Sequence, residues 1–186
     1  IRSLGLYRGV AFALGKVGIE TNAALSQANS VAELELQRRA RETADIWLQN
    51  YQVVSALAEA YGFDVIMALQ PNLFISGKPL RPYEREILEE MKLNEPVLVQ
   101  GTRLVYSAIQ DRLGTNDYGR IYDFTDVFND IHSSLYIDQT HVIGTGNRGV
   151  AERLYAAIQT QLCANMPEHA SQHVNDQITA RCTGSL

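Results

Sequence analysis

Apolar side chains recur every three or four positions between residues 30 and 61, which predicts one long helix. Ser30 followed by Glu33 is a capping-box pattern and marks the expected start of this helix. Gly62 marks its expected end, because glycine readily adopts the left-handed conformation that stops a helix. The polar residues 20–29 in front of the helix predict a loop.

Two short apolar runs predict strands. The run Val65–Leu69 is continuous rather than alternating, which is typical of a parallel strand covered on both faces. The second candidate is Ile121–Phe124. We expect the first strand to lie inside a parallel sheet, beside the second strand or one strand away from it.

Further helices are expected on either side of the second strand. Pro82 and Pro96 are typical first-turn prolines, and their helices should end near Leu93 and Gly114. A last amphipathic helix has apolar residues on one face between residues 150 and 162. The acidic residues 84–90 are interpreted as a solvated helix face.

The order of these elements predicts a layered α/β fold. Two strands cannot satisfy their own edges or cover several one-faced helices. We therefore expect further strands from outside this chain. The alternative is that residues 1–29, whose apolar positions 4–17 fit a helix face, supply a strand instead.

Composition adds limits on function. Apolar residues make up 46% of the 186 residues, so a packed core is expected. The net charge of −5 argues against a nucleic-acid partner, and no apolar run reaches the roughly 20 residues of a membrane span. Ile1 is not a methionine and no signal-peptide pattern follows it, so we expect the natural start to lie upstream.

The polar C-terminal region leaves the cell compartment open. Cys163 and Cys182 could form one disulfide or remain two free thiols. His169 and His173 are four residues apart, but with no third ligand they are interpreted as a solvated pair rather than a metal site. An extracytoplasmic or secreted location is our working expectation.

Asp138 and His141 are the sharpest chemical feature. Residues three apart in a turn lie on the same side, so the carboxylate can accept a hydrogen bond from one ring nitrogen. The other nitrogen is then a base of defined tautomer that can deprotonate a serine hydroxyl. We predict a direct hydrogen bond between the two side chains, with His141 facing a cleft at the carboxyl ends of the strands. The alternative is an Asp–His pair that caps the next helix.

The surroundings of this pair resemble the C-terminal part of SGNH/GDSL serine hydrolases. The shared pattern is a strand, a connection, the Asp138–His141 turn, Gly146-Asn147 and a closing helix. A long helix with Trp47 and Asn50 leads into a strand that ends Leu69-Gln70-Pro71, which resembles larger bacterial members of that group. The resemblance covers roughly residues 30–162.

The resemblance implies a flavodoxin-like three-layer α/β/α sandwich with a parallel sheet, only partly contained in this chain. Residues 1–166 would be the C-terminal portion of a single domain and residues 167–186 a polar tail. The implied activity is a serine esterase that acts on acyl or acetyl esters of carbohydrate or lipid, without a metal or other cofactor. Gln70, Asn72 and Phe74 follow the end of a strand and are candidate substrate-binding residues.

Two departures from the family pattern matter. Ile143-Gly144 stands where many members have Thr-Pro, which removes a helix-capping side chain. No Gly-Asp-Ser occurs in the 186 residues, so the serine is expected from an N-terminal segment of the same protein or from another chain. The Gly114–Asp117 sequence resembles the family's oxyanion motif, but its place in the chain predicts a helix-stop turn.

Two other functions remain open from the sequence. A carbohydrate O-acyltransferase would use the same residues, with a sugar hydroxyl in place of water. A non-catalytic domain that binds a glycan or a partner protein would have no serine turn upstream of Ile1.

Overall fold

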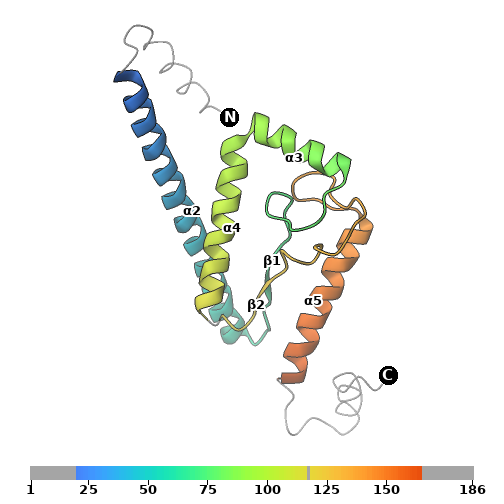
Figure 1. Ribbon diagram of the computed structural model, residues 1–186. Coiled ribbons are helices and arrows are strands. Elements are labelled where there is room, and N and C mark those ends of the chain that lie inside the picture. The colour runs from blue at the N-terminus through green and yellow to red at the C-terminus, as the bar shows by residue number, and fades with distance from the viewer. Residues whose placement is uncertain (1–19, 117, 165–186) are drawn as a thin grey trace, which may run out of the picture.

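The computed structural model describes residues 20–116 and 118–164. The elements follow one another in the order α2 (Glu20–Tyr61), β1 (Met67–Leu69), α3 (Pro82–Asn94), α4 (Pro96–Thr115), β2 (Ile121–Asp123) and α5 (Gly144–Ala164). The described chain is therefore a mixed α/β structure that is mainly helical (Figure 1). Among the helices that the structure describes, none has the length and apolar character that a bilayer crossing requires.

Helix α2 is continuous from Glu20, so the loop predicted for residues 20–29 is wrong. This stretch is polar but contains neither proline nor glycine, and nothing in it interrupts the backbone hydrogen bonds of a helix. The capping-box pattern at Ser30 and Glu33 lies inside the helix. The predicted end is confirmed, because Gly62 follows α2 with a φ of +70°.

Helices α3 and α4 begin at Pro82 and Pro96, as predicted, and a single residue separates them. Asn116 follows α4 with extended backbone angles, which confirms a helix-stop turn there. Asp117 lies outside the described residues, and so do the helical face predicted for residues 4–17 and the polar tail.

Strands β1 and β2 form a two-stranded parallel sheet in which Met67 pairs with Ile121 and Leu69 with Asp123. The predicted parallel pairing is confirmed. The strand begins at Met67 rather than Val65, and within the described ranges each strand has one neighbour, so the expected interior position is not seen there.

The sheet lies between the α2–α4 pair and α5, and α3 crosses one end of the molecule (Figure 1). A first hydrophobic cluster joins Ala44 of α2 and Leu69 of β1 to Ala108 and Ile109 of α4. Trp47 is partly buried and packs against this cluster.

A second hydrophobic cluster lies among α3, α5 and the loops that follow the strands. Its buried members are Leu73, Phe128, Leu135 and Tyr136, and Val150 of α5 packs against them. The rings of Phe128 and Tyr136 meet edge to face at 5.7 Å between centroids. Because Tyr136 stands two residues before Asp138, this cluster supports the candidate site.

One face of α2 carries exposed apolar side chains along its C-terminal half. Ile46, Val53, Leu57 and Tyr61 are all more than two-fifths exposed, and their spacing places them on a single face. We call these four residues the α2 stripe. Its large side chains have no cover within the described part of the chain.

Candidate active site

The candidate site is a tight reversal of the chain over residues 135–143, which we call the Asp–His turn. The N–H of Ile143 donates to the carbonyl of Leu135 at 2.9 Å, and that of Ile137 donates to the carbonyl of His141 at 2.9 Å. Tyr136 and Val142 pair as an isolated antiparallel bridge. These contacts place Asp138 and the two residues after it at the tip of the turn.

Asp138 binds both the backbone of the tip and the histidine ring. Its Oδ1 accepts the N–H groups of Thr140 at 2.8 Å and His141 at 2.7 Å. Its Oδ2 lies 2.7 Å from Nδ1 of His141, so the predicted direct hydrogen bond is confirmed. An ionised carboxylate can only accept, hence Nδ1 carries the proton and Nε2 of a neutral ring is left with a free lone pair.

These hydrogen bonds also keep Asp138 ionised. The backbone N–H groups of His141 and Thr140, followed by the ring of His141, hold the pKa of Asp138 well below its usual range. None of the Asp138 hydrogen bonds described here reaches the first turn of α5. Asp138 therefore orients the imidazole of His141 and does not cap α5.

The pair is open to solvent. The side chain of His141 is 77% exposed and that of Asp138 is 43% exposed. Within the described residues, His141 thus faces solvent rather than the cleft that we expected. An exposed Nε2 can be reached by a group from another segment.

The loop after β1 lies against the Asp–His turn, because the N–H of Leu73 donates to the carbonyl of Gln139 at 2.9 Å. The three residues that we expected to bind substrate lie in this loop. Asn72 and Phe74 are buried, and Oδ1 of Asn72 accepts the N–H of Phe74 at 2.9 Å. Gln70 is exposed, so of these three side chains it is the one that solvent reaches.

The first turn of α5 packs closely on the Asp–His turn. A Cβ atom at Gly146 would lie 2.7 Å from Cβ of Val142, so a larger residue would force the two segments apart. The N–H of Asn147 donates to the carbonyl of Ile143 at 3.0 Å, and its side-chain amide donates to that of Val142 at 3.4 Å. Gly146 and Asn147 therefore fasten the closing helix to the turn.

Sequence reasoning missed the residue that fastens the turn from its other side. Glu84 was interpreted as part of a solvated helix face, but its side chain is fully buried, and so is that of Lys78. The available signal was a glutamate at the third position of a helix that begins at Pro82, because such a side chain can accept the N–H of the residue in front of the helix, as Glu84 does from Arg81 at 2.8 Å. The solvated-face interpretation is wrong for Glu84.

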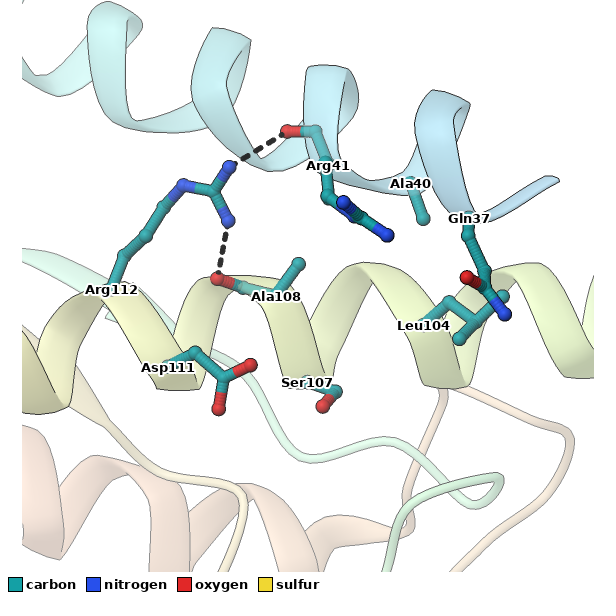
Figure 2. Close-up of a pocket in the computed structure, with 8 residues that line it drawn as sticks. All are labelled: Gln37, Ala40, Arg41, Leu104, Ser107, Ala108, Asp111 and Arg112. Carbon is teal, nitrogen blue, oxygen red and sulfur yellow. Dashed lines mark hydrogen bonds between the residues drawn. The ribbon is translucent and has the colours of Figure 1, made fainter. Parts of the chain in front are cut away.

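A hollow of about 200 Å³ lies elsewhere, between α2 and α4. Its eight lining residues come from these two helices and include no histidine (Figure 2). Arg112 spans it by donating to the carbonyls of Ala108 at 2.8 Å and Arg41 at 3.4 Å. Neither Asp138 nor His141 lines this hollow, so it has no part in their acid–base chemistry.

No group of three or more His, Cys, Asp or Glu side chains in residues 20–116 and 118–164 is arranged to hold a metal ion. Comparison of the chain with protein-family models, curated proteins and solved structures gives no match. Any proposal for function therefore depends on the geometry of the Asp–His turn and on the sequence pattern around it.

Proposed function

We propose that this chain is the acid–base part of a serine esterase that hydrolyses acyl or acetyl esters of carbohydrate or lipid. The observation that carries the proposal is the 2.7 Å contact between Oδ2 of Asp138 and Nδ1 of His141. This contact fixes the ring in the tautomer that a serine hydrolase needs.

In the proposed reaction, Nε2 of His141 removes the proton of a serine hydroxyl as the serine oxygen attacks the ester carbonyl. The same nitrogen returns the proton to the departing alkoxide, and a water molecule then releases the acyl group by the reverse proton transfers. Asp138 remains ionised throughout and stabilises the imidazolium. The serine and the oxyanion donors come from a segment outside these 186 residues.

The same outside segment would complete a flavodoxin-like three-layer sandwich. Two observations support this part of the proposal. Within the described ranges each strand of the β1–β2 sheet has a free edge, and the α2 stripe is open to solvent. Additional parallel strands and their helices would cover both.

The test is the substitution His141→Ala in the protein that carries this chain together with its serine-bearing segment. Hydrolysis of a nitrophenyl ester should fall by about 10³-fold or more, because loss of the base removes most of the catalysis by the triad. His132→Ala is the matched control, since His132 is another exposed histidine in a loop. Its turnover should stay within a few-fold of the wild-type value.

Near-normal turnover of the His141 variant would contradict the proposal. Absence of a Gly-Asp-Ser-like turn both from the upstream coding sequence and from any chain that binds this one would contradict it independently and would favour a non-catalytic binding domain.

A further inference from the structure

Lys78 precedes α3 and Glu84 lies in its first turn, and the two side chains form an ion pair in the interior. Nζ of Lys78 lies 2.6 Å from Oε2 of Glu84, and both side chains are fully buried. A buried charge is costly unless it is paired and hydrogen-bonded, and an apolar pair of similar volume is often equally stable. The presence of this pair therefore calls for a role other than stability alone.

Glu84 binds backbone N–H groups with both of its oxygens. Oε2, which holds Lys78, also accepts the N–H of Arg81 at 2.8 Å. Oε1 accepts the N–H groups of Leu135 at 2.8 Å and Tyr136 at 3.1 Å. One carboxylate thus joins the start of α3 to a segment more than fifty residues later.

The Asp–His turn has two antiparallel arms, and Leu135 and Tyr136 belong to the first. Tyr136 pairs with Val142 of the second arm, and Asp138 follows Tyr136 by two residues. A second contact comes from the same turn of α3, because the hydroxyl of Tyr83 donates to the carbonyl of Ile137 at 3.3 Å. Helix α3 therefore binds the backbone of residues 135–137, which immediately precede Asp138.

We propose that Glu84 is a positioning residue that fixes the first arm of the Asp–His turn and thereby holds His141 in its Nδ1-protonated tautomer. Lys78 balances the charge of this carboxylate in the interior. The effect on ester turnover rests on the proposed function, whereas the effect on the imidazole does not.

The test reads the ring of His141 directly, by ¹⁵N NMR of the protein that carries this chain together with its serine-bearing segment, labelled at histidine nitrogens. The wild-type spectrum should show a protonated Nδ1 and an unprotonated Nε2. In Lys78→Met/Glu84→Leu the arm loses its acceptor, and His141 should shift to a mixture containing the Nε2-protonated form. Lys78→Met/Glu84→Gln is the rescue variant: a glutamine oxygen can still accept from Leu135 and Tyr136, and the wild-type signals should be retained.

Wild-type His141 signals in a folded Lys78→Met/Glu84→Leu variant would overturn the inference. If that variant does not fold, Glu84→Asp decides the question. It keeps the charge but is one methylene shorter, so it cannot reach both Lys78 and the arm, and unchanged His141 signals would again overturn the inference. The NMR experiment needs no substrate, so it tests the role of Glu84 separately from the esterase activity. A protein that gives the expected spectra but hydrolyses no ester would refute the esterase proposal and leave the inference about Glu84 intact.

Discussion

Glu84 remains charged in the interior because hydrogen-bond donors surround it. Burial by itself would raise its pKa. The N–H groups of Arg81 and Leu135, the Lys78 ammonium and the N–H of Tyr136 together lower the pKa of Glu84 below its ordinary value of 4.5. The native state therefore binds a proton at this carboxylate less readily than the unfolded chain does.

This difference predicts how stability depends on pH. A carboxyl group with a lowered pKa stabilises the fold fully above its unfolded value, and this contribution is lost as the pH falls through the folded value. The free energy of unfolding should thus decrease as the pH drops below about 4.5. Denaturant titrations at a series of pH values measure the decrease in the protein that carries this chain together with its serine-bearing segment.

Lys78→Met/Glu84→Gln provides the comparison for this prediction, because it leaves no unpaired ammonium in the interior. The variant cannot release or bind a proton at position 84, so its stability should fall less steeply over the same range. Asp138 and Glu35 also have lowered pKa values, and they should leave a residual slope. Equal slopes for the wild-type protein and the variant would show that Glu84 does not contribute.

The two parts of the candidate site differ in how far the sequence could predict them. Asp138 and His141 are three residues apart, so their contact is decided locally and the spacing was sufficient. Glu84 meets Leu135 across 51 positions, and no local pattern marks that contact. For the same reason the burial of Asn72 and Phe74 did not follow from their place after a strand.

At the level of the elements, the signals that succeeded are those that act on the backbone itself. Pro82 and Pro96 fix the starts of α3 and α4, and Gly62 ends α2. The start of α2 has no such signal, and side-chain polarity alone misidentified residues 20–29 as a loop. The bounds of the two strands were predicted to within two residues, whereas the start of α2 lies ten residues before the predicted Ser30.

Two glycines test whether the backbone preferences of individual residues decide where the helices end. Gly62 adopts a φ of +70°, so Gly62→Ala should lower the free energy of unfolding by about 1 kcal/mol. Gly114 lies inside α4 with open space around its missing Cβ, so Gly114→Ala should raise the free energy by about 0.5–1 kcal/mol. Denaturant unfolding measures the two changes in variants of the protein that carries this chain together with its serine-bearing segment. The same sign for both would contradict the backbone argument.

At the scale of the whole molecule, the described chain leaves apolar surface and hydrogen-bonding groups uncovered. The α2 stripe is exposed, and each strand has a free edge within the described residues. We therefore expect the 186 residues alone to unfold without a sharp transition, to bind a hydrophobic dye and to hydrolyse no ester. A second, serine-bearing segment should restore both cooperativity and turnover.

Purification of the chain by itself tests this expectation by calorimetry and by nitrophenyl ester hydrolysis. A dye-free monomer with one sharp transition would show that the exposed surface needs no cover. Turnover that a serine-directed reagent abolishes would show that the nucleophile lies within these residues after all.

The pairing of the two strands also has a consequence for the folding kinetics. Met67 meets Ile121 54 positions later, across both α3 and α4. Closing a loop of that length costs roughly 3–4 kcal/mol of chain entropy before any sheet contact forms. The Asp–His turn, in contrast, closes within nine residues. The acid–base pair can therefore form early and locally, whereas its links to Leu73 and Glu84 must wait for the slow, long-range closure of the chain.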